Sequence, residues 1–139
     1  AIGKEVKIEV NRRGQVLTKS VTVIERKEPD YRFFDMISNE RNLIKRLGIL
    51  CLDLDKDSMQ LLPMEPRRKE GVVVAALSAT TSLFGENFEP GDILYSLNGE
   101  KIKGLRDLKA KTKEIGFGQI AVFHLERDGM LRYLILELE

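Results

Sequence analysis

Residues 89–99 read Glu-Pro-Gly-Asp-Ile-Leu-Tyr-Ser-Leu-Asn-Gly, and this stretch says most about the fold. Pro90-Gly91 is typical of a turn, because proline fixes φ at about −65° and glycine tolerates the conformations that follow. The apolar residues within 93–97 predict a short strand, and Asn98-Gly99 is a strong signal for a hairpin turn. The stretch therefore predicts a turn, a strand and a second turn in a mainly β domain.

Length and composition limit the class of protein. The 139 residues suit one domain with a fragment of another, and a hydrophobic share of 42% is enough for a core. A net charge of +1 gives no field that would attract nucleic acid or an anionic membrane. The longest apolar run, at 71–77, is too short to span a bilayer, so we expect no membrane insertion. The chain begins without Met or a signal peptide, and we expect it to be a piece of a longer protein.

Two segments of the chain are alike at an offset of 115 residues. Residues 3–14 and 118–129 each contain a glycine, an alternating strand and a turn that ends in glycine, and a second alternating strand follows each turn. The pattern predicts two β-hairpins of the same kind, and two unrelated amphipathic hairpins are the alternative. The apolar residues that coincide are Val6, Ile8 and Val10 with Ala121, Phe123 and Leu125, and Val21 and Val23 with Leu136 and Leu138.

Short helices and strands are predicted between the two hairpins. A charged break with Pro29 indicates a linker, and Asp30 is placed to cap a short helix that carries Phe33, Phe34 and Ile37. Imperfect alternation predicts a strand over 47–54, and helical spacing predicts a helix over 104–115. Further expected elements are a helical turn within 56–62 and a continuous strand over 72–77. The expected fold is mainly β with two or three short helices, arranged as a partly open β-barrel or sandwich.

Four motifs, which follow one another along residues 45–139 in the order of the family, resemble those of the PDZ domain, a peptide-binding module. The stretch 89–99 is similar to the family signature Pro-Gly-Asp-x-Ile-x-x-x-Asn-Gly, and Arg46-Leu47-Gly48-Ile49 resembles the loop that holds a peptide carboxylate. The segment 126–129, Glu-Arg-Asp-Gly, resembles the turn before the last strand in bacterial PDZ domains of HtrA/Deg-type serine proteases. The helix over 105–115 stands where the groove helix of the family follows. The resemblance implies the strand order of this bacterial branch, with the groove strand early and the closing hairpin last.

The resemblance also implies a domain organisation and a cellular location for the protein. Residues 1–27 are expected to be the closing hairpin of a preceding PDZ domain, 28–44 a linker with a short helix, and 45–139 a PDZ domain. The resemblance further implies a trypsin-like protease domain upstream of these 139 residues, and a periplasmic or other extracytoplasmic location.

A peptide groove is expected between the strand 49–54 and the helix 105–115. An extended peptide gains main-chain hydrogen bonds when it adds to an exposed sheet edge, and its carboxylate needs converging backbone N–H donors that glycine lets it approach. The alternative for Gly48 is that it only relieves crowding where a strand begins. Candidate peptide-binding residues are Arg46, Leu47, Gly48, Ile49, Leu50, Cys51, Leu105, Leu108, Lys109 and Thr112.

Two functions are compatible with this groove. The first is a non-catalytic module that captures C-termini or extended segments of unfolded proteins by β-strand addition and supplies them to an envelope serine protease. The alternative is a regulatory or assembly module whose groove is covered and which docks protease subunits. Either hypothesis allows a homo-oligomer.

Enzymatic, metal and nucleic-acid functions find little support in the residues. No Gly-x-Ser-x-Gly or related nucleophile motif is present, and His124 is expected on the outward face of its strand. Residues 53–57 begin like a calcium loop, but Ser58 stands where such a loop needs glycine, so Asp55 is expected to cap a helix. The basic run 67–69 lacks neighbouring aromatic residues, and we expect a solvated loop. We therefore expect no cofactor, no metal, no catalytic residue and no nucleic-acid partner.

Overall fold

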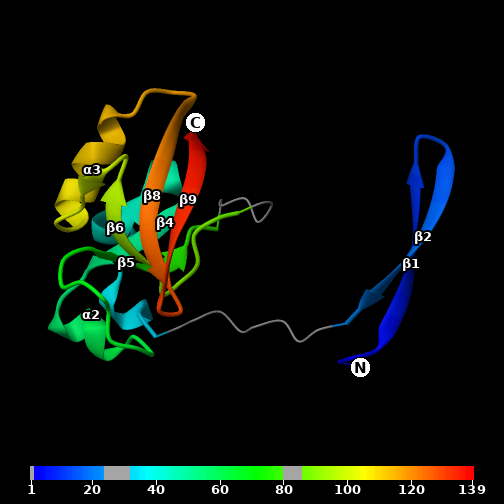
Figure 1. Ribbon diagram of the computed structural model, residues 1–139, viewed down its shortest axis with the longest axis horizontal. Coiled ribbons are helices and arrows are strands. Elements are labelled where there is room, and N and C mark those ends of the chain that lie inside the picture. Colours follow the sequence, from blue (N-terminus) through cyan, green and yellow to red (C-terminus); the bar gives the residue numbers. More distant parts are fainter. Residues whose placement is uncertain (1, 24–31, 80–85) are drawn as a thin grey trace.

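The computed structural model describes residues 2–23, 32–79 and 86–139, and the Lys27–Pro29 linker and Asp30 cap predicted above lie outside these ranges. Its first part is an antiparallel hairpin of β1 (Glu5–Arg12) and β2 (Gln15–Thr22), drawn in blue in Figure 1. A two-residue turn at Arg13-Gly14 joins the strands, and both turn residues have positive φ. This is the geometry of the tight turns that match the twist of paired strands. The strand pairing predicted for this segment is present, and its assignment to a preceding PDZ domain stays a prediction.

The remaining strands form one antiparallel sheet in the order β3-β4-β5-β6-β8-β9, and β7 pairs with the free side of part of β6. The two ends of this order do not pair with each other, so the sheet is open. The predicted mainly β fold, with helices beside a partly open sheet, is confirmed. The strands are β3 (Leu43–Ile44), β4 (Ile49–Asp53), β5 (Val72–Leu77), β6 (Ile93–Leu97), β7 (Glu100–Lys101), β8 (Gln119–Arg127) and β9 (Met130–Leu138).

Within the described residues, three α-helices accompany the sheet: α1 (Asn39–Asn42), α2 (Lys56–Gln60) and α3 (Leu105–Glu114). Asp55 begins α2 as predicted, because its Oδ1 accepts the N–H groups of Asp57 and Ser58 at 3.0 and 2.9 Å. The helix predicted around Phe33, Phe34 and Ile37 is wrong within the described residues. There the chain makes a single 3₁₀ turn at Phe34–Met36 and then starts α1 after Ser38.

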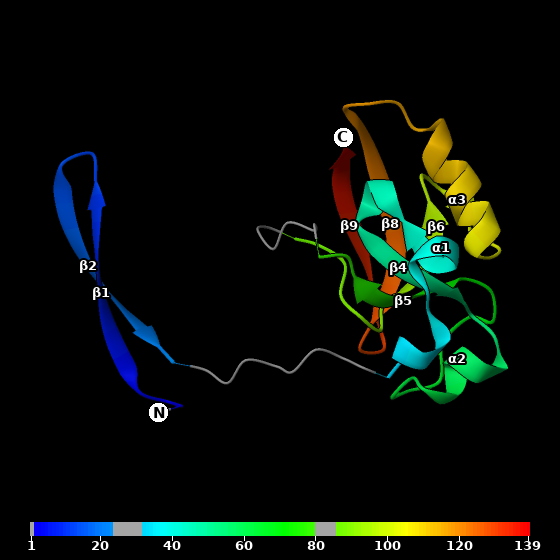
Figure 2. The ribbon, with the colours of Figure 1, turned by 180° about the vertical axis from the view of Figure 1, so that it is seen from behind.

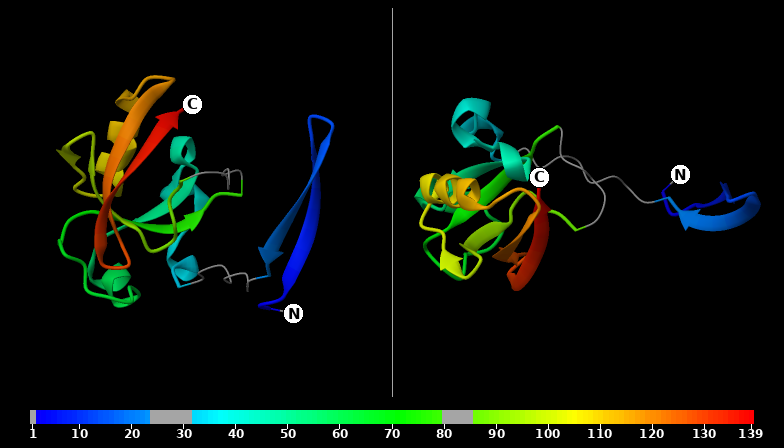
Figure 3. Two further views of the ribbon diagram at one scale, coloured as in Figure 1. Left: turned by 45° about the vertical axis from the view of Figure 1, so that its right-hand side comes forward. Right: turned by 90° about the horizontal axis from the view of Figure 1, so that it is seen from above.

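Strands β4, β5 and β6 are buried on both faces. One face contributes Cys51, Val74 and Leu94 to a core that α3 and the closing hairpin β8–β9 cover. The other face contributes Leu52, Val73 and others to a smaller core around Phe33 and α2. Figure 3 shows the helices on different sides of the strands. This double burial explains why the alternation within 47–54 and 72–77 is imperfect, since residues of both parities are apolar.

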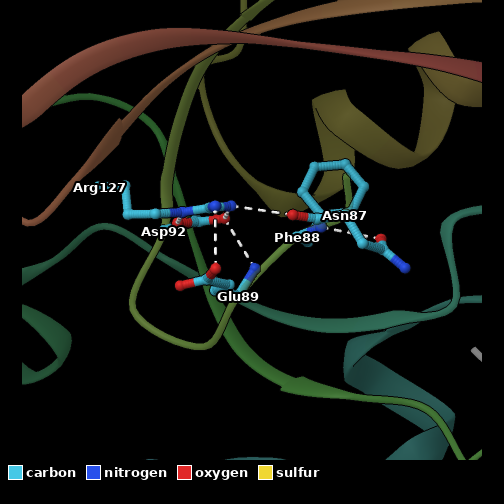
Figure 4. Close-up of polar contacts among 5 residues, drawn as sticks. All are labelled: Asn87, Phe88, Glu89, Asp92 and Arg127. Carbon is cyan, nitrogen blue, oxygen red and sulfur yellow. Dashed lines mark hydrogen bonds and ion pairs between the residues drawn. The ribbon is translucent and has the colours of Figure 1, made fainter. Parts of the chain in front are cut away.

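A buried ion pair joins the Pro90-Gly91 turn to the end of β8. The Asp92 side chain is 0% exposed. Its two oxygens accept hydrogen bonds from Nε and Nη2 of Arg127, both at 2.7 Å. Asp92 also accepts the N–H of Glu89 at 2.8 Å, which closes the turn. Arg127 further contacts Glu89 at 3.0 Å and the carbonyl of Asn87 at 2.9 Å (Figure 4). The pairing holds the closing hairpin to the rest of the domain.

Candidate functional site

The predicted carboxylate loop forms a single 3₁₀ turn over Lys45–Leu47 that ends at Gly48. Gly48 has φ 64° and ψ 31°, the left-handed conformation that costs glycine least. Its N–H points back to the carbonyls of Ile44 and Lys45 at 3.0 and 3.1 Å, and its own carbonyl accepts the N–H of Ser78 at 2.7 Å. The loop is therefore closed on itself and tied to the end of β5.

The predicted groove residues come together from β4 and α3. Leu47, Ile49, Leu50 and Cys51 line the start of β4, and each is no more than 8% exposed. Leu108 and Thr112 face them from α3 and are also buried. Leu105 and Lys109 of α3 are half-buried. Apolar walls of this kind suit an apolar peptide residue, but their burial means that protein atoms already cover them.

The main core, which contains Leu47, Ile49, Cys51 and Leu108, supplies most of this burial. The remaining edge of β4 is occupied by residues 38–44, which we call the covering segment. Its strand β3 pairs with β4 on the edge opposite β5, with Leu43 opposite Leu50 and Ile44 opposite Ile49. This is the edge to which a peptide would have to add if it lay between β4 and α3. Figure 2 shows α1, the other part of the segment, beside α3 and in front of β4.

Side-chain hydrogen bonds hold the covering segment in place. Asn42, 6% exposed, donates its amide to the carbonyl of Cys51 at 2.8 Å and accepts the N–H of Ser38 at 2.7 Å. Lys109 of α3 donates to the carbonyl of Arg41. Asn42 thus supplies a hydrogen-bond donor to a β4 carbonyl next to the two residues that β3 pairs with. Neither Asn42 nor Arg41 was among the predicted residues, because a single side chain that caps a carbonyl nine residues away leaves no periodic pattern.

Arg46 is used inside the domain and does not extend over the loop. Its guanidinium donates to the carbonyls of Thr112 at 2.7 Å and Gly116 at 3.4 Å, and also to that of Ile115. These carbonyls close the C-terminal end of α3, where a positive charge is favourable. Arg46 therefore links the carboxylate loop to the far end of the groove helix.

The titratable groups near the groove offer no nucleophile among the described residues. Burial raises the pKa of the Cys51 thiol far above its ordinary value, with only a small opposing effect from Lys109, so the thiol stays protonated. His124 lies on the outer face of β8, as predicted, and stacks on Tyr133 with 4.8 Å between ring centroids. Within residues 2–23, 32–79 and 86–139, no three His, Cys, Asp or Glu side chains gather as metal ligands would. The same part of the chain has no helix long and apolar enough to cross a membrane.

Comparison with known proteins agrees with this architecture. A family model described as PDZ domain matches residues 45–138, which is more than half of the chain. The match begins at the carboxylate loop and ends with β9. It therefore includes α2, α3 and every strand of the sheet except β3. No curated protein matches the chain significantly.

Proposed function

Since this chain belongs to the PDZ domain family, we propose that residues 45–138 bind the C-termini or extended segments of unfolded proteins by β-strand addition. PDZ domains are peptide-binding or protein-interaction modules and are not catalytic by themselves. The observation that carries the proposal is the arrangement of one loop, one strand and one helix. A left-handed Gly48 ends the loop, β4 follows directly, and α3 supplies an apolar wall through Leu108.

The ligand of this site is a peptide with an apolar C-terminal residue. Leu47, Ile49 and Leu108 provide apolar surroundings. Two nearby cationic groups are used elsewhere, because Arg46 donates to carbonyls at the end of α3 and Lys109 donates to the backbone carbonyl of Arg41. Burial of one large apolar side chain contributes about 1.5–3 kcal/mol, whereas an exposed charge pair contributes about 0–1 kcal/mol. The apolar residue should therefore dominate the affinity.

The module is further proposed to serve an HtrA/Deg-type serine protease of the bacterial envelope, in the periplasm or another extracytoplasmic compartment. The support is sequence resemblance: the Pro-Gly-Asp…Asn-Gly stretch and the Glu-Arg-Asp-Gly turn that ends β8. The protein's gene is expected to encode a His-Asp-Ser triad ahead of this segment. The purified chain itself should not cleave an unfolded protein, and cleavage that survives repurification would contradict the non-catalytic role.

A second candidate function is favoured by the covering segment. With residues 38–44 along β4, the domain could dock protease subunits through another surface and never admit a peptide. Fluorescence anisotropy with a labelled peptide that ends in an apolar residue separates the two candidates. The capture function predicts binding of the free-carboxylate peptide and loss of binding with its C-terminal amide.

The Asn42→Ala variant makes this test sharper. It removes the hydrogen bond to Cys51, whereas Asn39→Ala changes an exposed side chain of the same helix and serves as the matched control. If the covering segment competes with peptide, Asn42→Ala should bind several-fold more tightly than the wild type and Asn39→Ala should not. The absence of binding by all three proteins, each shown to be folded by circular dichroism, would refute capture and support docking.

A further inference from the structure

The N-terminal hairpin β1–β2 has the same internal geometry as the closing hairpin β8–β9. Adding 115 to each residue number of β1–β2 gives its counterpart, so the pair Val6–Val21 corresponds to the pair Ala121–Leu136. The whole register agrees in this way, and both turns have two successive residues with positive φ, Arg13-Gly14 and Asp128-Gly129.

The correspondence continues into the residues that flank the strands. The N–H of Gly3 donates to the carbonyl of Val23 at 2.7 Å, and the N–H of Gly118 donates to the carbonyl of Leu138 at 2.8 Å. Gly3 and Gly118 both have positive φ. Matched registers, turns and closing bonds over the same length are more than two unrelated hairpins would be expected to share.

The two hairpins differ in what covers them. The inner face of β8–β9 lies in the core, with Ala121, Phe123 and Leu125 at 0% exposure. The corresponding face of β1–β2 is exposed by 40–45% at each of its large apolar residues, and we call it the hairpin face. Its opposite side carries polar residues such as Glu5, Lys7 and Glu9, so the hairpin is two-sided like a strand pair on a core. The apolar residues of the hairpin face are Val6, Ile8, Val10, Leu17 and Val21.

Arg12 adds a polar element to this face. It is the counterpart of Arg127, the arginine that binds the buried Asp92 of the Pro-Gly-Asp turn. In the closing hairpin, the last residue of the first strand thus serves as the ionic link to the rest of the domain. Arg12 occupies the same position in β1 and is exposed.

From these observations we infer that the hairpin face is the docking surface for a PDZ-type domain that lacks its own closing hairpin, which we call the body. The body would offer an apolar core to Val6, Ile8 and Val10 and a carboxylate, at a turn like that of Asp92, to Arg12. A second copy of this chain does not fit the role, because its own β8–β9 already covers its core. The inference rests on family membership and is independent of peptide capture.

Two departures from the closing hairpin bear on the fit, and the first is that the apolar Leu17 stands at the position of the exposed Arg132. The second is that Lys19 is the counterpart of Leu134, which is 3% exposed in the closing hairpin. A lysine at the rim of a core can bury its stem and keep its ammonium in water, so the proposed body must be open to solvent at this position.

A graft within the full chain tests the inference. Residues 118–138 are replaced by the sequence of residues 3–23, which has the same length. Two such grafted proteins are made: one keeps Lys19, and the other carries Lys19→Leu. A hairpin that closes PDZ bodies should support a cooperative thermal transition in at least the leucine version. A control graft of the same composition exchanges Val6, Ile8 and Val10 with Glu5, Lys7 and Glu9. It puts the apolar residues on the outer face and should not fold.

The arginine gives the graft a second readout. In a folded graft, Arg12→Ala should lower the midpoint temperature by roughly 10 °C or more, as expected for loss of a buried ionic link in a domain of this size. Lack of a cooperative transition in both grafts, or equal folding of the control graft, would overturn the inference. A dimer of the intact protein that Val21→Asp abolishes would also overturn it, because the hairpin face would then serve a second copy.

Discussion

The ion pair between Asp92 and Arg127 offers a direct test of how the closing hairpin is held. Arg127→Met keeps an unbranched apolar stem but removes the guanidinium, so Asp92 loses two of the hydrogen bonds described above and keeps that of Glu89. Breaking a buried pair by removing one partner costs about 3–5 kcal/mol. Because the Arg127 side chain is 14% exposed and water can partly replace it, we expect a loss of about 3 kcal/mol in the free energy of unfolding.

Urea denaturation followed by circular dichroism measures this loss, and tyrosine fluorescence provides a second probe because the chain has no tryptophan. For a domain of this size, about 3 kcal/mol corresponds to roughly 12–24 °C in midpoint temperature. Arg132→Met, an exposed arginine on the neighbouring strand β9, is the control and should stay within about 0.5 kcal/mol. A loss below about 1 kcal/mol for Arg127→Met would refute the reasoning, since the buried carboxylate would then not need its partner.

The pH dependence of the same variant follows from the position of Asp92. Burial raises the pKa of Asp92 above its ordinary value of 3.8, although the hydrogen bonds from Arg127 act in the opposite direction. The folded state therefore holds this proton more tightly than the unfolded chain does. The contribution of Asp92 to stability is fully present below the unfolded pKa and is lost as the pH rises through the folded pKa. Without Arg127 the folded pKa rises further, so the loss caused by Arg127→Met should be largest at neutral pH and should shrink toward about pH 4. A loss that is constant from pH 4 to 7 would contradict this cause.

Three further predictions concern single side chains. Gly48→Val should weaken peptide binding and cost about 1–2 kcal/mol of stability, because a β-branched residue is strained at φ 64°; unchanged affinity in a folded Gly48→Val protein would remove Gly48 from the proposed site. The Cys51 thiol should not react with a chromogenic disulfide reagent at pH 8 in the native protein and should react fully in urea, whereas fast native labelling would show that β4 is accessible. Tyr95→Phe should cost about 1–3 kcal/mol in urea denaturation, because the hydroxyl donates to the buried carboxylate of Glu126 at 2.5 Å, and a neutral effect would mean that water replaces it.

Local signals in the sequence predicted most of the fold. The turns at Pro90-Gly91 and Asn98-Gly99 and the cap at Asp55 each depend on a few neighbouring residues, and the helix α3 depends on its apolar spacing. The helix expected around Phe33 was wrong, because Phe33 is drawn into the smaller core and the chain there completes only one 3₁₀ turn.

The parts that sequence reasoning missed depend on contacts between distant residues. Arg127 meets Asp92 across 35 positions, and Arg46 meets the carbonyl of Thr112 across 66. The covering segment was also missed, because Asn42 reads in sequence as one polar residue before a short apolar run. Such pairings follow from the fold as a whole and have no periodicity of their own. The sequence thus grouped residues of β4 and α3 that lie together in the structure, and their role as a peptide groove stays a prediction, whereas the covering segment was not foreseen.

Pairing of β3 with Ile49 and Leu50 has a kinetic consequence for any strand that adds to β4. The edge can accept a new strand only after residues 38–44 have left it, so opening precedes association. At high ligand concentration the observed association rate should then stop rising and level off at the rate of opening. Ligands that differ widely in affinity would reach the same plateau, and they would differ mainly in how slowly they dissociate.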